Sequence, residues 1–204
     1  MSKKQTTKPS NKAPKALIES ILEESIRIRQ KILSDKKIYS EIIAAVEMMV
    51  KCIKSGGTIF ACGNGGSSND AMHFVEELVA RYKRERRGIK AMHFMDPAVL
   101  TCWSNDYDYA TAFERQAQTF CGKNDILLAI STSGNSANVN KAVAVCKKNK
   151  AKTIALTGKD GGTLKNLADI CFVVPANETE RIQEVHITLI HIFCELIETH
   201  PSFV

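Results

Sequence analysis

The sequence predicts a single α/β domain: a five-stranded parallel sheet flanked by helices and preceded by two N-terminal helices. Five short apolar runs alternate with stretches of helical periodicity, which is the pattern of βαβ units. These runs lack polar alternation, as expected for strands buried on both faces. The length of 204 residues and the hydrophobic content of 44% suit one globular domain. No internal repeat or linker divides the chain.

The first fifteen residues are rich in Lys, Ser, Thr and Pro and contain almost nothing apolar. Such a segment cannot bury enough surface to become ordered, so we expect a disordered basic tail over 1–15 and the folded domain over 16–204. Five lysines of this tail precede the first acid, Glu19. Without them the 28 basic residues fall to 23, against 22 acidic ones. The basic charge therefore belongs to the tail and gives no support to nucleic-acid binding.

The tail lacks the apolar core of a secretory signal, and no run reaches the ~20 apolar residues of a membrane span. Seven cysteines are scattered without a C-x-x-C pair, which indicates neither a zinc thiolate site nor a disulfide framework. We therefore expect a cytoplasmic protein with no membrane partner.

Two amphipathic helices are predicted before the sheet, over 16–33 and 39–54, and Gly56-Gly57 follows the second in the manner of a C-cap. Two later helices are predicted over 68–82 and 178–199. The strands are predicted over 58–62, 91–94, 126–130, 153–156 and 170–174. Ligands of such sheets bind beyond the carboxyl ends of the strands.

A serine-rich loop, 131–136, connects a predicted strand to a helix that begins near Ala137. Its hydroxyl side chains are Ser131, Thr132, Ser133 and Ser136. Free N–H groups and the helix dipole favour an anion at this position. Ser136 would also serve as a simple N-cap, but four hydroxyls exceed the need of a cap, so we favour phosphate. Since the Walker and G-x-G-x-x-G patterns are both absent, a sugar phosphate fits better than a nucleotide.

A glycine loop over 63–67 also joins a strand to a helix. Its glycines permit positive φ and a close approach of ligand to backbone, although a tight βα turn is the alternative interpretation. The loop over 157–162 is interpreted as an ordinary connection without chemistry.

Four side chains on two helices form a candidate metal set. His73 and Glu77 are four residues apart and share a helix face. Gln183 and His191 lie on the late helix and are separated by ~12 Å along its axis, so joint ligation requires their side chains to lean together. Imidazole and carboxylate suit zinc, but the spacing by itself is a weak signal. His186, on the same helix, is interpreted as structural.

Two further segments have open interpretations. Asn105-Asp106 would bind sugar hydroxyls or form a capped turn. The basic run 81–87 is interpreted as the solvated end of a helix, where cations complement the helix dipole.

Taken in chain order, these motifs are similar to those of the phosphoheptose isomerase family of SIS domains. The matching segments are 62–67, 70–74, 76–78, 105–106, 128–139, 156–162 and 181–187. The resemblance covers nearly everything after the tail, and such a long ordered match is far more specific than one glycine loop.

The resemblance implies conversion of sedoheptulose 7-phosphate to glycero-manno-heptose 7-phosphate, the first step of bacterial heptose precursor synthesis. It also implies a homotetramer with sites between subunits. By the family pattern, Ser131, Thr132, Ser133 and Ser136 hold the phosphate, with Ser67 nearby. The residues that the resemblance implies in contact with the sugar are Asn64, Gly65, Gly66, Asn105, Asp106, Glu77 and Gln183. The zinc ligands would be His73, Glu77, Gln183 and His191.

Ketose–aldose interconversion moves a proton between C1 and C2 through an enediol, which requires a base and stabilisation of the oxygens. The resemblance makes Glu77 the base and His191 the acid, with zinc polarising the carbonyl. Because a zinc-bound carboxylate is a poorer base, we expect substrate to loosen Glu77 from the ion.

A non-catalytic function is the main competing hypothesis, because some SIS relatives bind the bacterial replication initiator. Those proteins lack the pair Glu77 and His191, and both residues are present here. A sugar-phosphate sensor domain and an isomerase of another ketose phosphate are also compatible with the motifs.

Overall fold

The computed structural model describes residues 13–202, so residues 1–12 of the predicted tail lie outside the described residues. Helix α1, Pro14–Ser34, begins two residues before the expected start of the domain. Proline is favoured at the first position of a helix because its missing N–H would have no partner there and its φ is already helical. Pro14 and Lys15, the last two residues of the predicted tail, therefore belong to α1.

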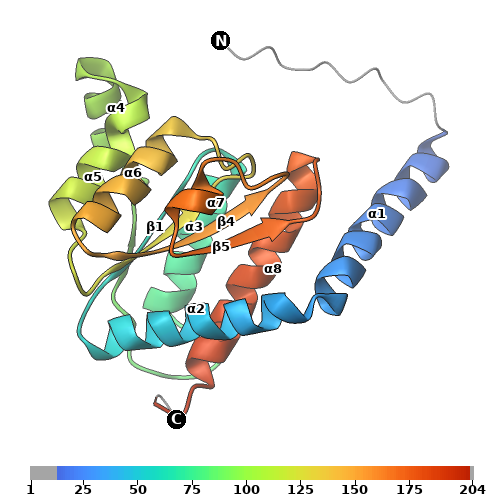
Figure 1. Cartoon of the computed structure of the whole chain (residues 1–204), viewed down its shortest axis with the longest axis horizontal. Coiled ribbons are helices and arrows are strands. Elements are labelled where there is room, and N and C mark those ends of the chain that lie inside the picture. The colour runs from blue at the N-terminus through green and yellow to red at the C-terminus, as the bar shows by residue number, and fades with distance from the viewer. Residues whose placement is uncertain (1–12, 203–204) are drawn as a thin grey trace.

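The second helix, α2 (Lys36–Lys54), starts directly after α1. The Asp35 side chain caps it by accepting a hydrogen bond from the backbone N–H of Lys37. Ile42, Val46 and Met49 face the core. In Figure 1, α2 runs along the lower side of the sheet, whereas α1 stands away from it. The two N-terminal helices are thus confirmed, and they have different environments.

The five predicted strands are present and form one parallel sheet in the order β2-β1-β3-β4-β5. Their bounds are β1 Ile59–Gly63, β2 Ala91–His93, β3 Ile126–Ile130, β4 Lys152–Gly158 and β5 Ile170–Val174. Gly63 pairs with Ile130, so the loops that follow β1 and β3 leave the sheet side by side.

The remaining helices connect these strands. They are α3 Gly66–Val79, α4 Pro97–Asp106, the 3₁₀ turn η1 Tyr109–Thr111, α5 Ala112–Phe120, α6 Ala137–Lys148, α7 Leu164–Leu167 and α8 Thr179–Glu198. None of the helices in the described part of the chain is long and apolar enough to cross a membrane.

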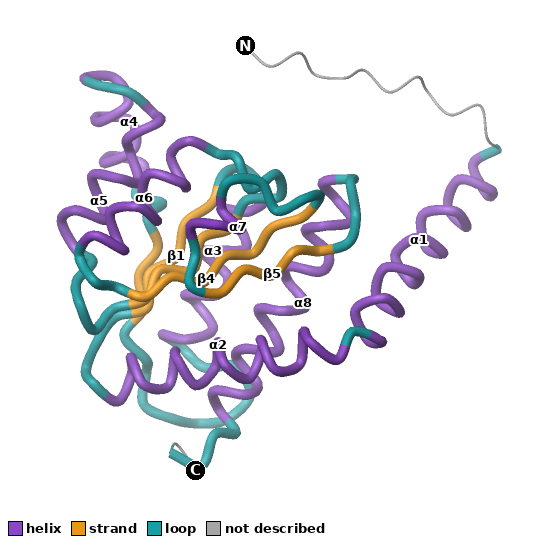
Figure 2. Tube along the Cα trace, in the orientation of Figure 1, coloured by secondary structure: helices purple, strands orange, loops and turns teal. Residues whose placement is uncertain are grey.

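Helices cover both faces of the sheet, as expected for strands without polar alternation (Figure 2). On one face, β1 residues Ile59 and Ala61 join the core formed with α2, α3 and α8. On the other face, Phe60 and Cys62 join the core formed with α5 and α6. The predicted architecture is therefore confirmed.

The third helix ends three residues earlier than predicted, at Val79 rather than at position 82. The backbone N–H groups of Tyr82, Lys83 and Arg84 donate to the buried carboxylate of Glu198 instead of to helical carbonyls. This tertiary contact replaces the hydrogen bonds that would continue the helix. The prediction that the run 81–87 is a solvated helix end is also wrong for Arg86, whose side chain is 11% exposed and pairs with Glu198.

Candidate functional site

The serine-rich loop lies where β3 ends and α6 begins, at the carboxyl edge of the sheet. Ser136 is the N-cap residue of α6, but its side chain makes no capping hydrogen bond. Its hydroxyl instead lies 2.9 Å from that of Ser131, which is 4% exposed. The first N–H groups of α6 are therefore not used by a Ser136 cap, and such groups favour an anion. The N-cap interpretation thus lacks its side-chain hydrogen bond, and the anion site stays a prediction.

This loop is held in shape by the segment after β4. Gly134 has φ of +64°, and an ideal Cβ on it would lie 1.9 Å from the carbonyl oxygen of Gly161. Asn135 accepts hydrogen bonds from both the backbone N–H and the hydroxyl of Thr163. The 157–162 loop, which was expected to carry no chemistry, thus has a structural role as the support of the serine-rich loop.

The glycine loop after β1 is built for close packing. Gly65 has φ of +57° at the N-cap of α3. An ideal Cβ on Gly66 would lie 2.3 Å from Nε2 of Gln183 on α8, so a larger residue at this position would displace that amide. Ser67 is 3% exposed and follows directly. The loop therefore brings Gln183 to the start of α3, as well as providing a turn.

The Asn64 side chain is engaged within the chain. Asn64 and Asn138 exchange two amide hydrogen bonds of 2.9 Å, and the Tyr109 hydroxyl donates to Asn64 Oδ1 at 2.6 Å. Asn138 is 2% exposed and ties the glycine loop to the first turn of α6. Sequence reasoning missed Asn138 and Tyr109, and only the polar character of Asn138 on a core-facing side of the helix could have drawn attention to it.

Three of the four predicted metal ligands come together where α3 packs against α8. The ligand atoms of His73, Glu77 and His191 all lie within 4.8 Å of one another. His73 Nε2 is 3.1 Å from Glu77 Oε1, and the two imidazole rings meet edge to face with centroids 5.2 Å apart. Glu77 has 15% of its side chain exposed and His73 has 42%, so the group is reachable from solvent. We call these three residues the triad.

Two imidazoles and a carboxylate are donors that zinc accepts, and three protein ligands leave a position open for a substrate oxygen. The triad thus fits a divalent metal by its chemistry and its mutual distances. Gln183 lies beside Gly66, about 12 Å along α8 from His191. Its assignment as a fourth ligand stays a prediction.

Asn105 and Asp106 are not brought to the triad within this chain. They form the end of α4 rather than a capped turn, and Asn105 Nδ2 donates to Asp106 Oδ1. Figure 1 shows α4 well separated from α8. Both residues are exposed, and their sugar contacts stay a prediction.

His186 is fully buried on α8 and serves the fold. Its Nε2–H donates to the carbonyl of Thr157 at 3.0 Å, which leaves Nδ1 buried with no hydrogen-bond partner among the described residues. Burial lowers the pKa of His186 to about 4, although the Thr157 hydrogen bond opposes this. The structural interpretation of His186 agrees with this environment.

His186 gives the protein a predictable acid sensitivity. Between pH 4 and 6.5 the unfolded chain binds a proton at this position that the folded chain does not. Titration of His186 therefore leaves the free energy of unfolding unchanged above pH 6.5 and lowers it as the pH drops below that value. We expect His186 to account for a loss of roughly 3 kcal/mol across this range. Urea unfolding at several pH values should show a shallower pH dependence for His186→Gln than for wild type. Equal slopes would show that His186 does not titrate in this way.

The comparisons with known proteins agree with this geometry. The SIS domain family matches residues 22–158. A phosphoheptose isomerase of Vibrio cholerae is 47% identical over 183 residues, which are 89% of this chain and 96% of the relative. The solved phosphoheptose isomerase of Neisseria gonorrhoeae has a TM-score of 0.85 at 37% identity and covers 92% of this chain and 100% of its own. That of Francisella tularensis has a TM-score of 0.87 at 34% identity, with coverages of 91% and 98%. The chain therefore belongs to the SIS domain family and, within it, to the phosphoheptose isomerases.

Proposed function

We propose that this chain isomerises sedoheptulose 7-phosphate to glycero-manno-heptose 7-phosphate, the first step of bacterial heptose precursor synthesis. The observation that carries the proposal is the pairing of a hydroxyl-lined anion loop at the sheet edge with the triad on the α3–α8 seam. The loop holds the phosphate of the substrate, and the triad offers a carboxylate and two imidazoles to the far end of the same substrate molecule. The family membership agrees with this division.

The spacing along α3 supports a long sugar phosphate as substrate. From Gly66, beside the loops at the sheet edge, to His73 the helix advances about 10 Å. Chain bonds advance about 1.2 Å each, so an extended open-chain heptose places C1 roughly 10 Å from its phosphorus. The substrate would therefore reach from the serine-rich loop to the triad.

The residues of the chain account for the proton transfers. Glu77 removes the proton from one of the two reacting carbons and returns it to the other through an enediol. His191, on the facing helix, exchanges protons with the oxygens of those carbons. The serine-rich loop fixes the phosphate, so that binding energy from the non-reacting end orients C1 and C2.

The proposed cofactor is Zn²⁺, held by His73, Glu77 and His191, with Gln183 as the predicted fourth ligand. When bound, it would supply Lewis-acid polarisation of the substrate carbonyl. The support is the donor chemistry and the closeness of the triad.

The proposed assembly is a homotetramer in the cytoplasm with sites between subunits. α1 exposes six large apolar side chains, although it is a well-formed helix standing away from the sheet (Figure 1). These residues are Leu17, Ile18, Ile21, Leu22, Ile26 and Leu33. Contiguous exposed apolar surface of this kind marks an interface. A partner seated here would also account for how the exposed Asn105 and Asp106 reach a site.

The proposal is tested by an isomerase assay of the purified full-length chain on sedoheptulose 7-phosphate, with and without a zinc chelator. Turnover that falls on chelation and returns with Zn²⁺ is expected. Folded, zinc-loaded protein without turnover would contradict the proposal, and binding of the replication initiator by that protein would favour the non-catalytic function.

A further inference from the structure

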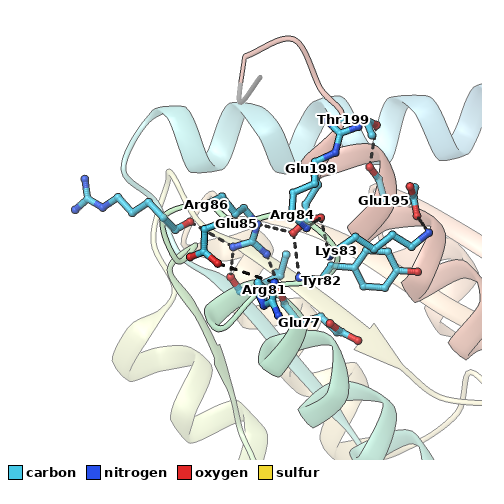
Figure 3. A network of polar contacts seen from close by, with 12 residues as sticks. Glu77, Arg81, Tyr82, Lys83, Arg84, Glu85, Arg86, Glu195, Glu198 and Thr199 are labelled. Carbon is cyan, nitrogen blue, oxygen red and sulfur yellow. Dashed lines mark hydrogen bonds and ion pairs between the residues drawn. The ribbon is translucent and has the colours of Figure 1, made fainter.

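The segment between α3 and β2 is organised by one buried carboxylate at the end of the last helix. Glu198 is 5% exposed and accepts three hydrogen bonds from the backbone N–H groups of Tyr82, Lys83 and Arg84, at 3.0, 2.9 and 3.1 Å. It also accepts from Arg86 Nε at 2.9 Å (Figure 3). A segment without helix or strand is thus fixed at four points by a single side chain.

Arg86 connects this segment to the C-terminal end of α3. Its guanidinium donates to the carbonyl of Glu77 at 2.7 Å and to that of Leu78 at 2.9 Å. The last carbonyls of a helix have no partners within the helix, so a buried cation at this place both satisfies them and complements the dipole. The turn of α3 that carries Glu77 is therefore tied through Arg86 to Glu198 on α8.

Tyr82 connects the same segment to His191. Its ring lies 5.9 Å from the His191 ring at an interplanar angle of 30°, while the His73 ring lies 5.2 Å from it at 69°. Lys83 pairs with Glu195, one turn beyond His191, and its Nζ lies 5.2 Å from the centre of the Tyr82 ring. Figure 3 shows the Tyr82 and Glu77 side chains extending to the same side of the segment. His191 is thus in contact with the rings of both His73 and Tyr82.

We propose that Glu198 is a positioning residue of the triad, acting through Arg86 on Glu77 and through the backbone of Tyr82 on His191. Tyr82 is then a further wall of the site. The inference rests on the proposed function in that it takes the triad to bind Zn²⁺. A triad held in place before the ion arrives loses less side-chain freedom on binding, so loosening it weakens the affinity.

The test measures zinc affinity, because a purely structural role of Glu198 would lower thermal stability and leave the affinity of the folded protein unchanged. The Zn²⁺ dissociation constant is measured by competition with a chromogenic chelator, at a temperature below that at which any variant begins to unfold. Glu198→Gln keeps the size of the side chain and removes its charge. We expect it to raise the dissociation constant about tenfold, the lower end of the effect of supporting residues at metal sites.

A matched control is available at the amino end of β3, outside the segment between α3 and β2. The Asp125 carboxylate accepts from the backbone N–H groups of Thr58 and Gly122 at 2.8 and 2.7 Å, and neither residue belongs to α3 or α8. Asp125→Asn should lower the melting temperature and leave the zinc affinity within twofold. Tyr82→Ala should weaken zinc about as much as Glu198→Gln, whereas Tyr82→Phe, which keeps the ring, should not.

Zinc affinity within twofold of wild type for both Glu198→Gln and Tyr82→Ala would overturn the inference. So would wild-type protein that binds no more zinc than His73→Ala, because the triad would then not be a metal site. A wild type that binds zinc at the triad and loses affinity in these variants, but does not isomerise the heptulose, would uphold the inference and contradict the proposed function.

Discussion

Replacing Glu77 by glutamine is expected to lower kcat for isomerisation by about a thousandfold, within the usual range for loss of a general base. The amide has the same shape but cannot accept a proton from carbon. Glu77 is the one carboxylate of the triad, so no equivalent oxygen there can take over its role. The measurement is steady-state turnover of sedoheptulose 7-phosphate by the zinc-loaded variant.

Glu76→Gln is the control, because it makes the same chemical change one residue away on an exposed position of α3. It should retain full turnover. Since Glu77 is proposed both as base and as metal ligand, zinc content must be measured in parallel. Turnover of folded, zinc-loaded Glu77→Gln within tenfold of wild type would exclude Glu77 as the base.

The second large effect is expected from Gly134→Ala, which should destabilise the fold by about 3 kcal/mol, from left-handed backbone strain together with overpacking. Gly134 has φ of +64°, and its new Cβ would meet the Gly161 carbonyl oxygen at 1.9 Å. The clash separates the serine-rich loop from its support, including the hydrogen bond from Leu164 N–H to the Gly134 carbonyl. The KM for the sugar phosphate should therefore rise at least tenfold.

Gly56→Ala separates the two causes of this effect. Gly56 also has positive φ, at +74°, but an ideal Cβ there meets no atom within 4 Å. Gly56→Ala should lower the free energy of unfolding by about 1 kcal/mol because of backbone strain, and it should leave KM unchanged. Urea unfolding and substrate titration of both variants provide the comparison. Equal losses of stability would show that the contact with Gly161 contributes nothing.

Local patterns in the sequence were sufficient for the architecture. The apolar runs of β1 and β3 are continuous because both sheet faces are covered. Together with the helical stretches between the runs, this implied parallel strands with crossover helices. The i,i+4 spacing of His73 and Glu77 implied their contact, since it depends only on helix geometry. The hydroxyls of the serine-rich loop indicated an anion site by their position before a helix.

Contacts between residues distant in the sequence could not be predicted in this way. His191 meets His73 and Glu77 because α3 and α8 pack side by side, which no spacing along one helix encodes. The early end of α3 was missed because Glu198, more than a hundred residues later, takes the backbone N–H groups of residues 82–84. Similarly, the role of Gly161 appears only where the 157–162 loop meets Gly134.

The α/β fold class, the hydroxyl-rich loop before α6 and the imidazole–carboxylate pair on α3 therefore follow from the sequence, because each depends on periodicity or on chemistry within a few residues. Which helix completes the triad, and where α3 stops, became clear only in the folded chain. The same holds for the contacts that keep Glu77 and Tyr82 in place. These features depend on a buried carboxylate and a helix seam whose partners are adjacent only after the chain has folded.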